Sequence, residues 1–367
     1  MRRLFLSILL MAAPSFAAFS WKVQLTYDHT KVGGGTENES SFPALISISD
    51  SSIKTTANGG KVSSSTGADL LAFSDSGCST QLPSELEFYD GTGGAAILWV
   101  EVSTLSYTSN GSIYVCTGNA SPPARMPNPW DANFSGVWHL PNGSTLTAND
   151  STTNANDGTV TGATAGAGKI DGAGSFNGTS NYIAFTNTIS PSSVSFGAWL
   201  YWEDSTGHAF PLFLGNSSGY GFFISGGADN CGYGNVIDVL VPGSTCDAAN
   251  SSYVLPTNAW TYVVATFNGS TWALYANGSL QSSQGGGHGN PDIPGGIDYY
   301  GLGSGSFHGL VDEARVSSVA RSAGWISTEY QNQNAPGNIG SAGFWTFGSW
   351  APVAPGSRGF QIVMEER

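Results

Sequence analysis

The chain has 367 residues, of which 26 are acidic and 12 are basic, so its formal net charge at pH 7 is −14. This acidity argues against nucleic acid as a partner, because a phosphate backbone attracts basic surfaces. Hydrophobic residues at 40% and aromatic residues at 12% exclude a disordered chain, and the 50 glycines with few charged residues favour an all-β protein.

The first 17 residues have the composition of a secretory signal peptide. Arg2 and Arg3 precede an apolar run over residues 4–13, and small residues around Ala17 form a cleavage site. We therefore expect a mature chain that is secreted or held at the cell surface. No later stretch has the roughly 18 consecutive apolar residues of a membrane span, so no transmembrane segment is expected.

Strand-like runs separated by turn residues follow over residues 18–120, which we predict to form an N-terminal β-sandwich. The runs include "KVQLTYD", "FPALISIS", "SELEFYD" and "AAILWVEV". Residues 121–133 are rich in proline, which lacks the amide hydrogen that a central strand needs, and are predicted to be a linker. A second β unit, a jelly roll, is predicted for residues 134–335, and the tail 336–367 adds one or two strands.

Asn-Gly pairs between strand-forming residues predict tight hairpins in the second unit. One pair lies at 177–178, and two more, at 268–269 and 277–278, divide residues 259–280 into three strands. In the first of these strands both sets of alternating side chains are apolar, so we expect cover on both of its faces. A short helix is predicted only for residues 322–331.

Four cysteines, an even number in an exported chain, predict disulfides. Three sets of pairs are possible. The predicted domain boundary favours pairs within each unit, which are Cys78 with Cys116 and Cys231 with Cys246. Metal binding by these cysteines is the weaker alternative, because the chain has no C-x-x-C pair.

Two long segments resemble bacterial families. The stretch from "FPALISI" through "ADLLAFSD" and "SELEFYD" to "SIYVCTGN" resembles the domain of unknown function 2341. The blocks "GVWHL", "GAGSFNGTSNYIAF", "WTYVVATFNGSTWALYANGSL" and "GLVDEARV" resemble the laminin-G-like, concanavalin A-like jelly rolls of secreted proteins. The resemblance implies two β-sandwiches. It implies no chemistry for the first, and for the second a scaffold used in glycan binding, adhesion, calcium binding or spacing.

Glu85 and Glu87 alternate along one strand, so their carboxylates lie on the same face, about 7 Å apart along it. Inverting glycosidases hold two carboxylates about 6.5 to 9.5 Å apart, which makes this pair the catalytic candidate for a glycoside hydrolase or lyase. The alternative is a polar strand face or a contact with the neighbouring domain. A G-x-S-x-G match at 215–219, near His208, lacks the following helix of a nucleophile elbow and is attributed to chance.

In laminin-G-like relatives, the acid of the "DEARV" strand often helps to hold a structural calcium ion with polar groups of the "FNGTSNY" hairpin. The resemblance therefore implies a calcium site built from oxygen ligands. Its candidate ligands are Asp150, Asp157, Asn177, Asn181 and Asp312. Strand alternation places Asp312 and Glu313 on opposite faces, and the alternative for Asp312 is a pair with Arg315 or a turn cap.

The histidines show no H-x-H or H-E-x-x-H spacing, which argues against a zinc enzyme. His139, in "VWHL", is predicted to be a half-buried strand residue rather than a ligand.

Aromatic residues at strand ends and in Gly-rich loops stack on sugar rings where they are exposed. The ligand-binding candidates are Tyr201, Trp202, Tyr220, Tyr233, Tyr299 and Tyr300. The loop 285–301 is the expected rim of the site. We therefore predict a non-catalytic protein that binds a polysaccharide or cell-surface glycan through the jelly-roll loops. The alternatives are a glycoside hydrolase or lyase and a structural adhesion or spacer protein.

Overall fold

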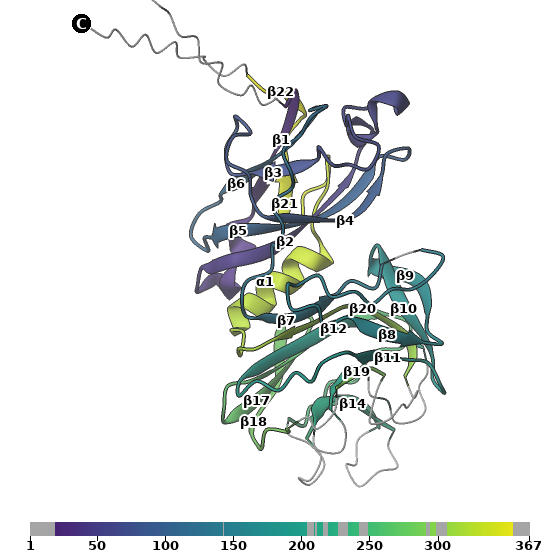
Figure 1. Ribbon diagram of the computed structural model, residues 1–367. Coiled ribbons are helices and arrows are strands. Elements are labelled where there is room, and N and C mark those ends of the chain that lie inside the picture. The colour runs from purple at the N-terminus through teal and green to yellow at the C-terminus, as the bar shows by residue number, and fades with distance from the viewer. Residues whose placement is uncertain are drawn as a thin grey trace, which may run out of the picture.

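The chain folds into two lobes with the helix α1 (Ala323–Asn334) between them (Figure 1). The computed structural model describes residues 19–141, 143–203, 209, 211–215, 219–226, 234–241, 249–290, 294–298 and 307–354. Antiparallel sheets form both lobes, which confirms the predicted all-β class. No helix among the described residues is long and apolar enough to cross a membrane. The predicted signal peptide, residues 1–17, lies outside the described residues.

The N-terminal lobe contains two sheets, with strand orders β21-β1-β6-β3, where β22 also pairs with β1, and β2-β5-β4. The strands are β1 (Trp21–Tyr27), β2 (Glu39–Ser49), β3 (Leu71–Phe73), β4 (Ser84–Asp90), β5 (Ala95–Leu105), β6 (Ser112–Thr117), β21 (Trp345–Phe347) and β22 (Ala351–Pro352). Short 3-10 helices connect some of them: η1 (His29–Lys31), η2 (Gly33–Gly35), η3 (Ser51–Ile53) and η4 (Thr56–Asn58). The alternating apolar residues of both sheets share one buried cluster, which includes Leu25, Ile46 and Leu98.

The C-terminal tail returns to this lobe. Strands β21 and β22 pair with β1, with Leu25 opposite Phe347. The sequence predicts strands in the tail but does not indicate the sheet that they join.

The predicted disulfide between Cys78 and Cys116 is confirmed. It ties the loop after β3 to β6. The other predicted partners, Cys231 and Cys246, lie outside the described residues.

The jelly-roll lobe contains a sheet of order β18-β17-β16-β12-β20-β10-β9, with β7 also paired to β20, and a second sheet of order β15-β14-β13-β19-β11-β8. The strands of the larger sheet are β7 (Phe134–Trp138), β9 (Thr164–Ile170), β10 (Gly172–Asn177), β12 (Val194–Trp202), β16 (Trp260–Phe267), β17 (Thr271–Ala276), β18 (Ser279–Gly285) and β20 (His308–Ser317). Those of the second are β8 (Gly158–Thr161), β11 (Tyr182–Phe185), β13 (Phe213–Leu214), β14 (Tyr220–Gly226), β15 (Gly234–Leu240) and β19 (Gly296–Ile297).

The predicted three-stranded meander is confirmed as β16, β17 and β18. At its second turn, Asn277 and Gly278 have φ angles of 49° and 75°, as a type I′ turn requires. The hairpin predicted at Asn177-Gly178 is wrong. The chain leaves one sheet there and enters the other, because β10 pairs with β20 and β9 whereas β11 pairs with β19 and β8.

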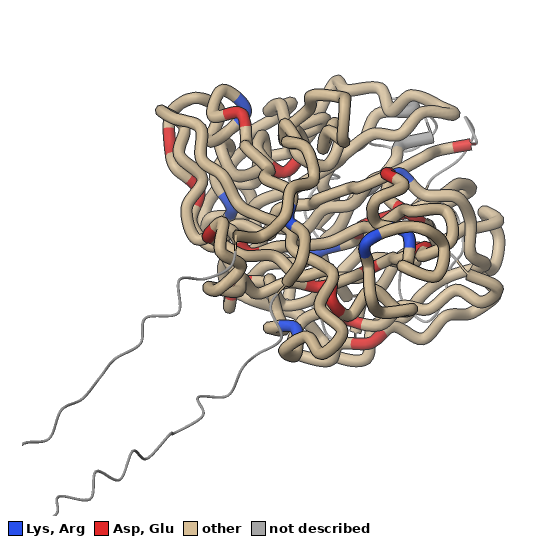
Figure 2. Tube along the Cα trace, turned by 90° about the horizontal axis from the view of Figure 1, so that it is seen from above, with Lys and Arg blue, Asp and Glu red and all other residues tan. Residues whose placement is uncertain are grey.

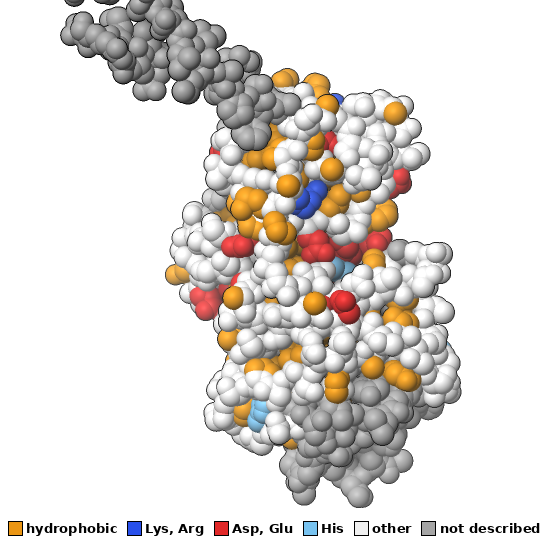
Figure 3. Space-filling view, in the orientation of Figure 1, with side chains coloured by type: hydrophobic (Ala, Val, Ile, Leu, Met, Phe, Trp, Pro, Cys, Tyr) orange, Lys and Arg blue, Asp and Glu red, His pale blue; other side chains and the backbone are white. Residues whose placement is uncertain are grey.

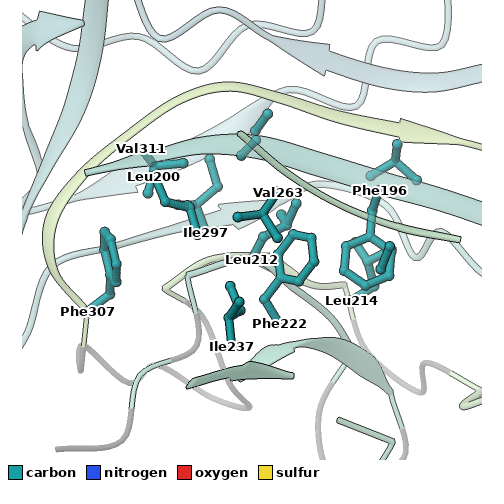
Figure 4. Packing of buried hydrophobic residues seen from close by; sticks show 14 of the residues in the cluster. Phe196, Leu200, Leu212, Leu214, Phe222, Ile237, Val263, Ile297, Phe307 and Val311 are labelled. Atoms are coloured by element: carbon teal, nitrogen blue, oxygen red, sulfur yellow. The ribbon is translucent and has the colours of Figure 1, made fainter. Parts of the chain in front are cut away.

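Strand β16 is covered on both faces, as predicted. Figure 4 shows its inner side chain Val263 among Leu200, Phe222 and Val311, in the core between the two jelly-roll sheets. The outer side chains of β16 belong to another buried cluster, which also contains Ile326 of α1. The outer face of the larger sheet is therefore buried by elements outside the jelly roll.

Helix α1 provides part of this cover and links the lobes. It begins where predicted, since the N-cap Ser322 Oγ accepts a hydrogen bond from the backbone N–H of Trp325, and it runs three residues past the predicted end. The Asn332 side chain exchanges two hydrogen bonds with the backbone of Leu45 in β2. On the jelly-roll side, Gln333 accepts a hydrogen bond from the Trp199 indole.

Candidate functional site

The predicted catalytic pair lies in the seam between the two lobes. Glu85 and Glu87 both reach the same imidazole, that of His139: Glu85 Oε2 lies 3.7 Å from Nε2 and Glu87 Oε2 lies 3.5 Å from Nδ1. A third carboxylate oxygen, Glu313 Oε1, lies 2.8 Å from Nδ1. The expectation of a half-buried His139 is therefore wrong, because the ring is 5% exposed and surrounded by carboxylates.

A buried arginine completes this group. Arg315 donates to Glu313 Oε2 at 2.7 Å and to Glu329 Oε1 of α1 at 3.1 Å. Its guanidinium lies over the rings of Trp99 and Trp130, at 4.4 and 5.1 Å from their centroids. The seam cluster consists of Glu85, Glu87, His139, Asp312, Glu313, Arg315 and Glu329. Figure 3 shows acidic side chains and a histidine between the two lobes.

The prediction that Asp312 and Glu313 lie on opposite faces of their strand is wrong, because β20 contains a β-bulge. Both flanking residues, Val311 and Ala314, belong to the inner core. Glu313 has a positive φ of 53°, and the β12–β20 register shifts nearby, so both acids lie on the outer face. Asp312 Oδ2 accepts a hydrogen bond from the N–H of Ile170 at the β9–β10 turn, so it caps a turn rather than pairing with Arg315.

Burial and neighbouring charges shift the pKa values of the side chains in this cluster in different directions. Burial, with the charge of Glu313, raises the pKa of Glu87 to about 8. The same two causes raise the pKa of Asp312 well above its ordinary value. Burial opposes the charged form of His139, but the carboxylates of Glu313 and Glu87 outweigh it and raise the pKa of the imidazole well above 6.5. The pKa of Glu85 is lowered, because hydrogen bonds and the charge of His139 outweigh its burial.

Divergent pKa values are a property of acid–base pairs, but both predicted catalytic carboxylates are held by other side chains. Indole N–H groups hold both predicted catalytic carboxylates: Trp99 donates to Glu87 at 2.7 Å and Trp130 donates to Glu85 at 2.9 Å. The void beside Arg315 has a volume of about 20 Å³, which is close to the size of one water molecule. The geometry therefore fits the alternative expectation, a contact with the neighbouring domain.

The indoles of Trp99 and Trp130, His139 and Arg315 were not predicted to form one group. A signal was present in "GLVDEARV", where three charged residues interrupt an apolar strand. Buried charges need partners, so this strand predicts an ionic contact. The partner residues, however, lie far away in the sequence.

The prediction that the aromatic candidates bind a ligand is wrong for two of them. Trp202 and Tyr220 are 2% and 0% exposed and belong to the inner core, so neither is available to a ligand. Tyr201 is half-buried and packs on Trp260, with ring centroids 5.4 Å apart. The remaining candidates, Tyr233, Tyr299 and Tyr300, lie outside the described residues.

The predicted calcium ligands do not form one group. Asp150 accepts hydrogen bonds from three backbone N–H groups, and its own N–H donates to Asp157. Asn177 accepts a hydrogen bond from the N–H of Asn181 within a turn, and Asp312 belongs to the seam cluster. In the described part of the chain the three acids are not within ligand distance of one another. Calcium binding at these residues stays a prediction.

An open groove lies at the β7 edge of the jelly-roll lobe, with a volume of about 450 Å³. The loop groove is lined by Ala132, Phe134, Ser135, Asn154, Asn156, Thr188, Ile189, Ser190, Pro191 and Ser318. None of these side chains is charged. This agrees with Figure 2, in which charged residues are sparse along the trace. Ser190 donates to Asn290 at 3.1 Å, which connects the groove to the predicted rim 285–301.

A segment of each lobe matches a known family. Residues 67–129 match the domain of unknown function 2341, and residues 177–327 match the family described as the Concanavalin A-like lectin/glucanases superfamily. The chain therefore contains one segment that matches each of these two families, in this order. This confirms the predicted families and their order. No match was found among curated proteins.

Similar solved structures have low identity to the chain. Domain 4 of AbnA, a GH43 extracellular arabinanase from Geobacillus stearothermophilus, in complex with arabinotriose, has 20% identity and a TM-score of 0.46, over 55% of this chain and 99% of that chain. The botulinum neurotoxin serotype D binding domain has 16% identity and a TM-score of 0.40, over 55% and 51%. A Trypanosoma rangeli sialidase has 12% identity and a TM-score of 0.43, over 68% and 44%. The chain thus spans about half the length of the last two structures.

Proposed function

We propose that the protein binds carbohydrate without cleaving it, and that the ligand occupies the loop groove. The uncharged, polar lining of this groove carries the proposal. Its volume of about 450 Å³ lies within the range of about 300 to 1,000 Å³ of small-ligand sites. Hydroxyl and amide side chains both donate and accept hydrogen bonds, so the lining suits a neutral polyhydroxylated ligand.

The family of the second lobe supports a carbohydrate ligand, since its description names lectins and glucanases. Binding is favoured over cleavage by the state of the two candidate carboxylates. Glu85 and Glu87 are held by indoles and lie beside His139, while the groove lining contains no carboxylate.

The site of action that we propose is outside the cytoplasm, in the secreted fraction or at the cell surface. The N-terminal sequence supports this, because residues 1–17 have the composition of a signal peptide. The Cys78–Cys116 disulfide supports it as well, since such bonds persist in oxidising compartments.

A glycan array with the mature protein, followed by calorimetric titration of the best oligosaccharide, tests the proposal. Thr188 is exposed and lines the groove, so Thr188→Arg should fill it and raise Kd by tenfold or more. Thr159 is also exposed but lies on β8 and does not line the groove, so Thr159→Arg is the matched control and should leave Kd unchanged.

Both variants should retain the free energy of unfolding to within about 0.5 kcal/mol, as exposed substitutions usually do. Release of new reducing ends from a bound glycan would contradict the absence of cleavage. An array without binding would favour the spacer alternative, and equal losses in the two variants would place the ligand elsewhere.

A further inference from the structure

The seam cluster contains more carboxyl groups than cationic groups, and several of its atoms make no hydrogen bond. Five carboxylates, of Glu85, Glu87, Asp312, Glu313 and Glu329, meet two cationic side chains, of His139 and Arg315. His139 Nε2, Glu87 Oε1 and Asp312 Oδ1 are buried and make no hydrogen bond. Such atoms cost free energy unless something else satisfies them.

We propose that Glu87, His139 and Glu313 bind one divalent transition-metal ion of the Zn²⁺ type, which ties the two lobes together. One ligand atom from each of these three side chains lies within 4.8 Å of the others. Zinc bonds to nitrogen and oxygen are about 2.0 to 2.2 Å long, so two ligand atoms of one ion lie about 3 to 4 Å apart. Small side-chain adjustments bring the three atoms into this range.

The groups around these three side chains are of the kinds found in the outer shell of a metal site. Glu85 Oε2 lies 3.7 Å from His139 Nε2, the ring nitrogen that faces away from the other two carboxylates. Arg315 holds Glu313 by its second oxygen, at 2.7 Å. Carboxylate partners of a ligating histidine and hydrogen bonds to ligating carboxylates orient the ligands.

The ligand types indicate the kind of ion. An imidazole nitrogen with two carboxylates favours a transition metal, whereas calcium and magnesium prefer oxygen ligands throughout. Glu87 belongs to β4 of the N-terminal lobe, while Glu313 belongs to β20 of the jelly roll and His139 directly follows β7 of the jelly roll. Binding would release the protons held by His139 and Glu87, because metal ligands must be deprotonated. This role is structural and does not depend on the proposed glycan binding.

Cobalt titration of the metal-free full-length mature protein tests the proposal, because Co²⁺ replaces Zn²⁺ and gives visible absorption bands. We expect one Co²⁺ per chain, displaced by Zn²⁺, and a higher melting temperature with either ion. Glu87→Gln and His139→Gln should weaken binding by tenfold or more.

His308→Gln is the matched control, because His308 forms a similar histidine–carboxylate pair with Glu203, at 3.5 Å, on the surface. It should bind Co²⁺ as the unsubstituted protein does. No binding, or binding that only His308→Gln removes, would overturn the proposal and leave the seam an ionic network. Should the seam variants fail to fold, anomalous scattering at the zinc edge from crystals of the unsubstituted protein decides: a peak beside His139 supports the site, and its absence refutes it.

Discussion

The two faces of the larger jelly-roll sheet belong to the same strands but are stabilised differently. The inner face carries apolar side chains such as Leu200 and Val263, which need only an apolar cover. The outer face carries the buried charges of Glu313 and Arg315, which are stable only beside partners in a fixed geometry. Burial of the apolar inner face thus drives formation of the sandwich. The charges of the outer face are stable only when the N-terminal lobe and α1, which carry their partners, cover it.

Removal of the buried cation should have the largest effect. Arg315→Met leaves Glu313 and Glu329 buried without their partner, which should lower the free energy of unfolding by about 3 to 5 kcal/mol. Denaturant unfolding measures this loss. The triple variant Arg315→Met/Glu313→Gln/Glu329→Gln should lose less than the single one, because it removes the unpaired charges. An equal or greater loss would mean that packing rather than charge stabilises the outer face.

A cavity on the inner face should lower the free energy of unfolding slightly less than the loss of Arg315 does. Leu200→Ala removes a side chain that is 0% exposed in the core, and should lower the free energy of unfolding by about 2 to 4 kcal/mol. Leu200→Met nearly conserves volume and should cost less than about 1.5 kcal/mol. If both variants cost the same, the inner face would not be a packed core.

The carboxyl of Glu39, on the N-terminal lobe beside α1, should make the free energy of unfolding depend on pH. Burial raises its pKa to about 7 from 4.5, with added repulsion from Glu37 and Glu329. The folded chain therefore holds a proton that the unfolded chain releases, and the free energy of unfolding falls as pH rises from 4.5 to 7. Glu39→Gln should remove this fall, giving a gain of about 1 to 3 kcal/mol at pH 8 and little change at pH 4.

Unfolding curves of Glu39→Gln at pH 4, 6 and 8 test the expected slope. Glu101→Gln, on the half-buried part of β5, serves as the control and should not change it. A difference between Glu39→Gln and the unsubstituted protein that stays constant with pH would contradict the assignment.

Loss of the α1 cap should have the smallest effect. Ser322→Ala leaves the N–H of Trp325 without its partner and should cost about 1 kcal/mol. Ser322→Thr keeps the hydroxyl and should cost less. Thermal unfolding compares the two, and identical melting temperatures would show that the cap does not stabilise this cover of the outer face.

Period-two alternation made the inner face and the meander predictable. Composition and spacing predicted the short helix, and the predicted domain boundary favoured the Cys78–Cys116 disulfide. The same alternation would have placed Trp202 inside, since it follows Phe196 and Leu200 on the core side of β12. The outer face was less predictable, because the bulge at Glu313 breaks the alternation. Its partners, such as Glu87, come from another lobe, and no local pattern identifies such a contact.

Hydrogen exchange with and without the best-binding array oligosaccharide tests the central claim, that the outer face is closed by the N-terminal lobe and the ligand binds in the loop groove. We expect slower exchange at residues 132–135, 154–156 and 188–191, no change at residues 85–87 and 312–315, and no new reducing ends. Slower exchange at residues 85–87 and 312–315, with cleavage of the oligosaccharide, would contradict the claim and make the seam an active site.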